Sequence, residues 1–382
     1  MSVAGPLLLA LAAVYAWHLA AFARGFRRAA RASDARPAPD PDALPLVTVV
    51  IPARDEEAAI GACLDGVLAQ DYPRLQVLVV DDDSSDATPD IVRARAARDP
   101  RLGLVQVPEN RHRARAHKKA AVAKAVGRAE GEIVVQTDAD CQVGPGWVGA
   151  LVRAFDAPDV AFVSGPAAYR LAPGAGLLHR VQAYDFFGVM ACGAGSIGLG
   201  RPTMANGACV AYRRDTFLRL GGFDGIDHLS SGDDELLMQK VAYRGGGRVR
   251  FCADPAALVL TDPLDTVGAV VRQRRRWASK SASYPWRVQR VVLALGASLA
   301  ALAAATLALP FVPGLWPWVA AALGVKLAAD LAVMVPAARR FGRRRLFTAL
   351  PVHLVIHAPV AVAIGLLGPL GRFEWKGRSL DR

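Results

Sequence analysis

The stretch Glu132–Asp140, which reads EIVVQTDAD, decides the fold. Its apolar half, Ile133 to Gln136, predicts a short buried strand that runs into two acids one residue apart. On an extended backbone, side chains at positions i and i+2 point to the same side, so Asp138 and Asp140 can converge on one point. Their hard carboxylate oxygens suit Mg²⁺ or Mn²⁺, especially when phosphates already carry the metal. An ordinary Asp-rich turn gives the same short pattern, so the rest of the chain must decide.

The chain around this stretch alternates between apolar runs and helical segments. Strands are expected at Val47–Pro52, Leu75–Val80 and Leu104–Val107, and helices over 56–70, 88–98 and 114–129. This alternation predicts an α/β fold with a mostly parallel sheet flanked by helices. In such sheets ligands bind beyond the carboxyl ends of the strands, so both strand–acid junctions should lie at the same sheet edge.

Three acids follow the second strand, at Asp81–Asp83. One of them can accept hydrogen bonds from a nucleotide base or from ribose hydroxyls. The next residues, Ser84–Asp86, also suit the N-cap of a helix, and both roles can hold together. The sequence contains no G-x-x-x-x-G-K-[ST], and no G-x-G-x-x-G directly follows any of these predicted strands, which disfavours P-loop and Rossmann-type nucleotide binding.

Composition points to a membrane. Hydrophobic residues make up 53% of the 382 residues, and the apolar excess lies at 6–23 and after residue 290. The net charge is +12, and arginines cluster beside these apolar segments. An anionic membrane surface explains this charge better than nucleic acid does, so no nucleic-acid partner is expected. The five cysteines have no zinc or redox spacing and are interpreted as reduced thiols in a cytosolic domain.

Several segments are long enough to cross a bilayer. Pro6–Ala23 is uncharged and is followed by arginines, which favours a retained anchor over a cleaved signal peptide. Prolines split the next apolar run into a hairpin over about 289–309 and 314–337, in which Lys326 and Asp330 are spaced to pair. The last run, Leu346–Gly371, is compatible with either a full crossing or a re-entrant segment.

Five stretches in this order resemble the family 2 inverting glycosyltransferases of the GT-A type. They are VVIPARDEE at Val49–Glu57, VVDDDSSDAT at Val79–Thr88, TDAD at Thr137–Asp140, SGDDELL at Ser231–Leu237 and QRRRW at Gln273–Trp277. The last matches Q-x-x-R-W, which marks the membrane-bound branch that includes ceramide-glucosyltransferase-like enzymes and cellulose and hyaluronan synthases. Asp55 stands where Asn is usual, Asp83 where Gly is usual and Asp233 where Glu is common.

The resemblance implies transfer of a sugar from a nucleotide-diphospho-sugar, with a UDP-sugar favoured, and it assigns the donor site. Pro52, Glu56 and Asp81 line the nucleoside pocket. Lys118, or its neighbour Lys119, lies beside the uridine and phosphates. Asp138 lies near the ribose and the metal, and Asp140 is the metal ligand proper. The divalent metal would be Mg²⁺ or Mn²⁺. Both lysines could instead be helix-surface charges.

The resemblance also assigns the acceptor side. Asp234 is the catalytic base, Asp233 supports it, and Gln273, Arg276 and Trp277 hold the diphosphate and the acceptor end of the site. The simpler alternatives are that Asp233–Glu235 only charge the first turn of a helix and that Arg272–Arg276 form a basic turn before the membrane. The Gly- and aromatic-rich stretch Gly174–Gly207 is either an amphipathic helix at the membrane interface or a helix packed on the sheet.

These features predict five segments: a transmembrane anchor (1–31), a linker (32–45), a cytosolic GT-A domain (46–287), transmembrane segments (288–371) and a basic tail (372–382). The tail WKGR at Trp375–Arg378 resembles that of ceramide-glucosyltransferase-like relatives. The protein is expected in the inner membrane with its catalytic domain in the cytoplasm. A synthase that secretes a polymer needs enough helices to enclose a channel, so the small number of membrane segments favours a single transfer to a lipid or lipid-linked acceptor. Processive polysaccharide synthesis is the alternative. A non-catalytic membrane scaffold is the third possibility.

Overall fold

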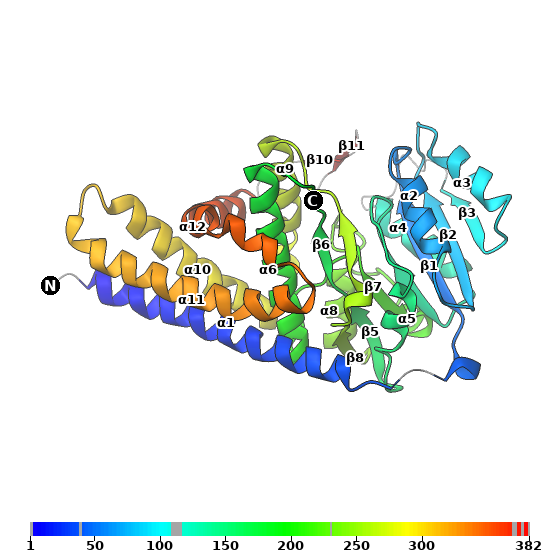
Figure 1. The fold of residues 1–382 in the computed structure, drawn as a ribbon, viewed down its shortest axis with the longest axis horizontal. Helices are drawn as coiled ribbons and strands as arrows, with labels where there is room; N and C mark the ends of the chain where they lie inside the picture. Colours follow the sequence, from blue (N-terminus) through cyan, green and yellow to red (C-terminus); the bar gives the residue numbers. More distant parts are fainter. Residues whose placement is uncertain are drawn as a thin grey trace. The chain divides into compact units, whose positions relative to one another are not determined.

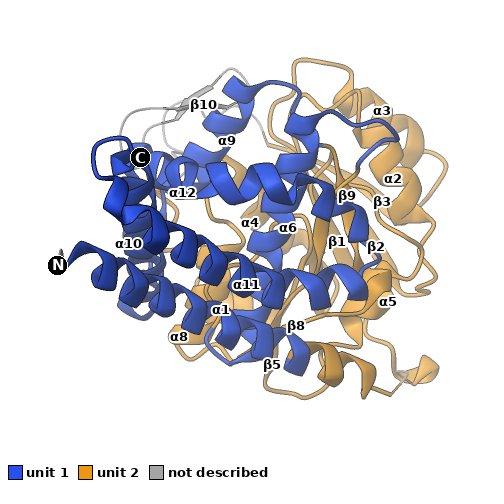
Figure 2. Ribbon diagram, turned by 60° about the vertical axis from the view of Figure 1, so that its left-hand side comes forward, with its two compact units in different colours: residues 1–28, 171–201, 263–371 blue, residues 29–170, 202–262, 372–382 orange. Residues whose placement is uncertain are grey.

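The computed structural model describes residues 3–37, 40–107, 117–229 and 231–368, together with two short antiparallel strands, β10 (Phe373–Trp375) and β11 (Arg378–Leu380) (Figure 1). The chain forms two compact units (Figure 2). The helical unit comprises residues 1–28, 171–201 and 263–371, and the sheet unit comprises residues 29–170, 202–262 and 372–382. The side chains of the predicted WKGR tail lie outside the described residues.

The sheet unit is built on a seven-stranded sheet with the order β3-β2-β1-β4-β7-β5-β8. Its strands are β1 (Val47–Ala53), β2 (Leu75–Asp81), β3 (Leu102–Gln106), β4 (Ile133–Gln136), β5 (Val160–Ser164), β7 (Val210–Arg213) and β8 (Arg248–Phe251). β7 pairs antiparallel with both of its neighbours, and the other pairings are parallel. The predicted α/β fold with a mostly parallel sheet is therefore confirmed.

The remaining elements of the sheet unit are short. Its helices are α2 (Ile60–Leu68), α3 (Thr88–Ala96), α4 (His117–Arg128), α5 (Trp147–Val152), α7 (Arg214–Arg219) and α8 (Glu235–Tyr243), and β6 (Ala167–Tyr169) pairs with β9 (Val259–Thr261). The central strands have apolar side chains on both faces, as parallel strands covered on both sides require. Every residue of β1 except Pro52 is buried.

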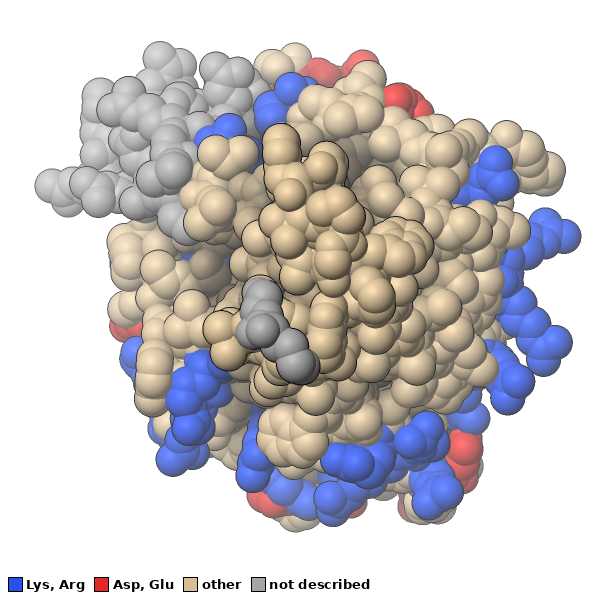
Figure 3. Space-filling model, turned by 90° about the vertical axis from the view of Figure 1, so that its left-hand side faces the viewer, with Lys and Arg blue, Asp and Glu red and all other residues tan. Residues whose placement is uncertain are grey.

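The helical unit contains α1 (Ala4–Asp34, of which residues 4–28 belong to this unit), α6 (Leu177–Gly198), α9 (Val267–Ala278), α10 (Trp286–Ala308), α11 (Trp316–Arg340) and α12 (Leu350–Leu367). Short 3-10 turns occur in the chain at Pro41–Ala43, Pro255–Ala257, Ser281–Ser283, Pro313–Leu315 and Arg344–Ala349. Among the described residues, four helical segments are long and apolar enough to cross a membrane: Ala4–Asp34, Trp286–Ala308, Pro313–Arg340 and Arg344–Leu367. The surface shown in Figure 3 has a centre without charged side chains, and lysines and arginines lie towards its edges.

Helices α1 and α6 approach each other through glycines. A Cβ on Gly195 would collide with the backbone of Phe22, and one on Gly198 would collide with the backbone oxygen of Gly25. Small residues allow such close helix packing in membrane proteins. Because most of its side chains in the segment Gln182–Ile197 are buried, α6 is an internal helix of this unit.

The predicted pairing of Lys326 with Asp330 is confirmed. Lys326 Nζ lies 2.5 Å from Asp330 Oδ2 on α11, and both side chains are buried. The hydroxyl of Tyr15 on α1 donates to the other oxygen of Asp330, at 2.6 Å. A buried charge is costly unless it is paired, so this network both neutralises Lys326 and joins α1 to α11.

Candidate active site

Three parallel strands end at one edge of the sheet. Asp81, the last residue of β2, lies opposite Ala53 at the end of β1, and β1 also pairs in parallel with β4. Asp138 and Asp140 follow β4 directly. The carboxyl ends of β1, β2 and β4 therefore bring both predicted strand–acid junctions to the same edge, as the sequence indicates.

The loops after β1 and β2 hold each other in an unusual backbone conformation. Asp55 and Asp83 have φ values of +49° and +58°, in the left-handed region that Gly and Asn adopt most readily. Arg54 Nη1 donates to the carbonyl oxygens of Asp82 and Asp83, at 2.5 and 2.7 Å. The backbone N–H of Ser85 donates to Asp55 Oδ1, at 2.8 Å. Asp55 and Asp83, two of the three positions where the sequence departs from its family pattern, thus both adopt a left-handed backbone.

The predicted nucleoside-binding residues lie on this edge. Pro52 is half-buried in β1, and Asp81 is buried with Oδ1 accepting the backbone N–H of Ser84 at 3.3 Å. The backbone N–H of Glu56 donates to Thr88 Oγ1 at 2.7 Å, which fixes the loop after β1 against the start of α3. Asp81 thus stabilises its own loop, and its contact with a nucleoside stays a prediction.

Lys118 connects Asp138, a predicted metal-site acid, with Asp233, a predicted catalytic acid. Its Nζ lies 2.7 Å from Asp138 Oδ1 and 3.1 Å from Asp233 Oδ2. Burial lowers the pKa of Lys118, but the charges of Asp138 and Asp233 outweigh it and hold the pKa above its usual value. Lys119 instead points to the backbone, where its Nζ donates to the carbonyl oxygens of Ile226 and Leu229 at 2.6 and 2.8 Å. Of the two lysines, Lys118 is therefore the one beside the acids.

Asp138 and Asp140 can hold a cation together. One ligand atom from each, with the sulfur of Cys141, lies within 4.8 Å of the others. Asp140 is exposed and accepts a hydrogen bond from Thr261 Oγ1 at 3.3 Å. Burial, and then the charges of Asp140 and Asp138, raises the pKa of the Cys141 thiol well above its usual value, so the carboxylate oxygens are the natural donors. This donor set fits a hard divalent cation such as Mg²⁺ or Mn²⁺.

The two acids before α8 have different surroundings. Asp233 is buried and accepts a hydrogen bond from Gln136 Nε2 at 2.8 Å. Burial raises its pKa, but the charge and hydrogen bond of Lys118 and the bond from Gln136 lower it to about 2. Asp234 caps α8, with its two oxygens accepting the backbone N–H groups of Glu235 and Gly207, each at 2.6 Å. Their assignment as supporting acid and catalytic base stays a prediction.

Sequence reasoning assigned no individual role to three residues of this site: Gln136, Gly207 and Thr261. Gln136 was visible as the one polar residue of the short apolar run Ile133–Gln136, and its amide now bridges β4 to Asp233. Gly207 and Thr261 reach the acids from distant parts of the chain, through a backbone N–H and a hydroxyl that no local pattern reveals.

The remaining predicted residues, Gln273, Arg276 and Trp277, lie on α9 in the helical unit. The ring of Trp277 packs against Phe186 of α6, with 5.8 Å between centroids. The guanidinium of Arg274 lies over the same indole, 4.4 Å from its centroid, which favours a cation–π contact. The sheet unit thus contains the other eight predicted residues, and these three belong to the other unit.

Two family models match the chain. The model described as glycosyl transferase family 2 matches residues 48–215, and the model described as glycosyl transferase family group 2 matches residues 133–356, more than half of the chain. The second match continues from the sheet unit through α9 and into the apolar helices.

Curated relatives include an N-acetylglucosaminyltransferase of Rhizobium meliloti (strain 1021), 31% identical over 252 residues, or 62% of this chain and 55% of the relative. Glycosyltransferase AglE of Haloferax volcanii is 26% identical over 252 residues, which cover 65% of this chain and 77% of AglE. The chain spans about half the length of the first of these relatives.

A solved structure is similar along most of the chain. It is the mannosyltransferase PcManGT from Pyrobaculum calidifontis, in complex with GDP-Man and Mn²⁺. The TM-score is 0.57 and the identity 26%, over 94% of this chain and 96% of that one. A protein of similar fold thus binds a nucleotide sugar together with a divalent metal, which agrees with the donor set of Asp138 and Asp140.

Proposed function

Because this chain belongs to glycosyl transferase family group 2, we propose that it is a membrane-bound glycosyltransferase. It transfers a sugar from a nucleotide-diphospho-sugar, a UDP-sugar in the first instance, to a hydroxyl of a lipid or lipid-linked acceptor, with inversion at the anomeric carbon. The observation that carries the proposal is the convergence of Asp138, Asp140 and Lys118 at the carboxyl edge of the sheet.

The donor side of the reaction needs charge neutralisation. A divalent cation on Asp138 and Asp140 would neutralise the leaving diphosphate. Lys118 adds a positive charge beside Asp138, and the carboxylates of Asp138 and Asp233 keep it protonated. Asp81, at the end of β2, is the acid proposed to contact the nucleoside.

The acceptor side needs a base. Asp234 takes the proton from the acceptor hydroxyl as that oxygen attacks the anomeric carbon from the face opposite the leaving group. The backbone N–H groups of Glu235 and Gly207 fix its carboxylate, so the base is oriented before the acceptor arrives. With a pKa of about 2, Asp233 is too weak a base for this step and serves to hold Lys118 in place.

Membrane attachment supports a lipid acceptor. In the part of the chain that the structure describes, four helical segments are long and apolar enough to span a bilayer, which is few for enclosing a polymer channel. Arginines follow the apolar part of α1, so we place the sheet unit in the cytoplasm and the helices in the inner membrane. Because relatives are named N-acetylglucosaminyltransferases, an N-acetylglucosaminyl donor is the first to test.

The test is release of nucleoside diphosphate by the purified, detergent-solubilised protein. UDP-N-acetylglucosamine, UDP-glucose and GDP-mannose are each supplied with a membrane lipid extract, with and without EDTA. We expect release with one donor only, its loss in EDTA, and a lipid product heavier by one sugar. A ladder of products would instead identify a processive synthase.

Two variants separate chemistry from binding. Asp234→Asn should abolish turnover and retain donor binding, and Asp140→Asn should weaken metal-dependent donor binding. Asp90→Asn is the matched control, because Asp90 is exposed on α3 and pairs only with its helix neighbour Arg93 among the contacts described. Turnover by Asp234→Asn at the parent rate would contradict the base assignment, and absence of donor-dependent thermal stabilisation would contradict the proposed function.

A further inference from the structure

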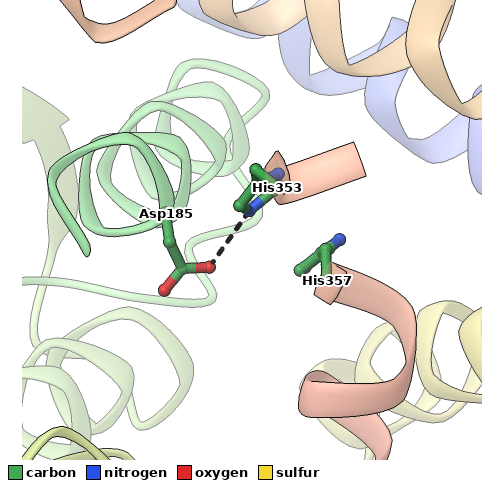
Figure 4. Close-up of side chains that lie close together, drawn as sticks. All are labelled: Asp185, His353 and His357. Carbon is green, nitrogen blue, oxygen red and sulfur yellow. Dashed lines mark ion pairs between the residues drawn. The ribbon is translucent and has the colours of Figure 1, made fainter. Parts of the chain in front are cut away.

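A second group of possible metal ligands lies in the helical unit, apart from the acids of the sheet unit. Asp185 comes from α6, and His353 and His357 come from α12. One ligand atom from each of the three side chains lies within 4.8 Å of the others. Figure 4 shows the Asp185 carboxylate facing His353, with His357 beside it on the same helix.

The two histidines share one face of α12. They are spaced i and i+4, which places their side chains one above the other on a helix. Their rings stack with centroids 4.6 Å apart and an interplanar angle of 19°. This spacing is the one that lets two imidazoles of a single helix bind the same metal ion.

The histidine nitrogens lack partners that burial would normally require. His353 is 6% exposed, and among the described residues neither of its ring nitrogens has a hydrogen-bond partner. The same holds for Nδ1 of His357. Asp185 Oδ1 is 3.5 Å from His353 Nε2, which is too long for a good hydrogen bond. A buried polar group without a hydrogen-bond partner costs about 1–3 kcal/mol of folding free energy. A ligand bound between these ring nitrogens and the carboxylate would remove that cost.

Arg274 prepares the carboxylate for this role. Its Nη2 lies 2.6 Å from Asp185 Oδ2, which leaves Oδ1 on the side of His353. A carboxylate that binds metal through one oxygen is commonly held by a hydrogen-bond donor on the other. The nearby ammonium of Lys326 is paired with Asp330, so its charge is already compensated.

We propose that Asp185, His353 and His357 form a second metal site, which binds Zn²⁺ or a similar first-row transition metal. Two imidazoles and one carboxylate are the ligand set that zinc uses when it keeps an open fourth position. This chemistry differs from the all-oxygen preference of Mg²⁺. Because Arg274 lies on α9 with Gln273, Arg276 and Trp277, the metal would also fix the helix that carries those residues.

The test measures metal binding directly and does not depend on glycosyl transfer. The full chain is purified in detergent with a histidine-free tag, treated with chelator, and loaded with Co²⁺ as a spectroscopic substitute for Zn²⁺. All proteins carry Asp140→Asn, which removes a carboxylate of the sheet unit's candidate site. We expect visible d–d absorption at one Co²⁺ per chain, displaced by Zn²⁺.

Variants locate the site. His353→Asn and His357→Gln should each remove the Co²⁺ band, and Arg274→Gln should weaken Co²⁺ binding roughly 10–100-fold because it acts through Asp185. His179→Ala is the matched control, since His179 also lies beside an acid, 3.1 Å from Asp265, but outside the cluster. Monodisperse elution and unchanged circular dichroism show that each variant folds. Absence of the band before any histidine is changed, or its persistence in His357→Gln, overturns the proposal.

Discussion

The ammonium of Lys118 lies 2.7 Å from Asp138 Oδ1, so the first acid of the D-x-D motif is already paired with a cation of the same chain. The same ammonium lies 3.1 Å from Asp233, which is two residues before the first residue of α8. Lys118 thus links Asp138, on the predicted metal side of the site, to Asp233, on the predicted acceptor side. Without it, two partly buried carboxylates would face each other with less compensation.

Replacing Lys118 by Met should therefore destabilise the protein and impair donor binding. We expect a loss of about 1.5–3 kcal/mol, the range for hydrogen bonds to charged groups. Thermal unfolding in detergent would measure the loss of stability, and calorimetry would measure the loss of donor binding. Lys124→Met is the control, because Lys124 lies on the same helix and donates only to the exposed carbonyl of Gln106 among the contacts described. Additive effects of Lys118→Met and Asp138→Asn would contradict the pairing.

Asp233 should make stability depend on pH below neutrality. Its pKa is about 2 in the folded chain and about 3.9 when unfolded, so the unfolded chain binds more protons in acid. The stabilisation is complete above about pH 4 and is lost as the pH falls towards 2. Asp233→Asn should flatten this dependence and lower stability at neutral pH. Unfolding midpoints of the parent chain, Asp233→Asn and the control Asp90→Asn, measured from about pH 2 to neutral pH, would test this prediction. A pH profile of Asp233→Asn identical to that of the parent chain would refute it.

Much of this site followed from local sequence. The strands β1, β2 and β4 were readable because their apolar runs end in acids, and parallel pairing then brings those acids to one edge. The sequence could not reveal which of Lys118 and Lys119 faces the acids, because that depends on the carbonyls of Ile226 and Leu229 far along the chain. Nor could it pair Asp185 with His353, which distant helices bring together.

The left-handed backbone at Asp83 predicts an asymmetric response to substitution. Asp83→Gly should be tolerated, since Gly adopts a φ of +58° without strain, although the contact with Arg54 at 3.8 Å is lost. Asp83→Val should cost about 1–2 kcal/mol more, because a β-branched side chain is disfavoured there. Comparison of the two unfolding midpoints checks this, and equal midpoints would show that the backbone is not constrained.

The glycine contact between α1 and α6 should tolerate no added methyl group. Gly195→Ala places a Cβ against the backbone of Phe22, which cannot move aside as a side chain can. Overpacking of this kind typically costs about 1–3 kcal/mol. Gly188→Ala, on the same helix, is the control, because its Cβ would only touch the sulfur of Met334 at 3.5 Å. Similar thermal stability of the two variants in detergent would argue against close packing of these helices.

The buried network of Tyr15, Lys326 and Asp330 predicts unequal effects for its members. Tyr15→Phe removes one hydrogen bond to Asp330 and leaves the ion pair intact, so we expect a loss of about 0.5–1.5 kcal/mol. Asp330→Ala leaves the ammonium of Lys326 buried without its partner, which should cost about 3–5 kcal/mol.

Removing both charges should therefore rescue the protein. In the double variant Lys326→Met/Asp330→Leu, no charge is left to desolvate, so we expect stability well above that of Asp330→Ala and near that of the parent chain. Detergent thermal-shift measurements on the single and double variants would test this. If the double variant were as unstable as Asp330→Ala, the loss would come from altered packing between α1 and α11, and the uncompensated charge would not be its cause.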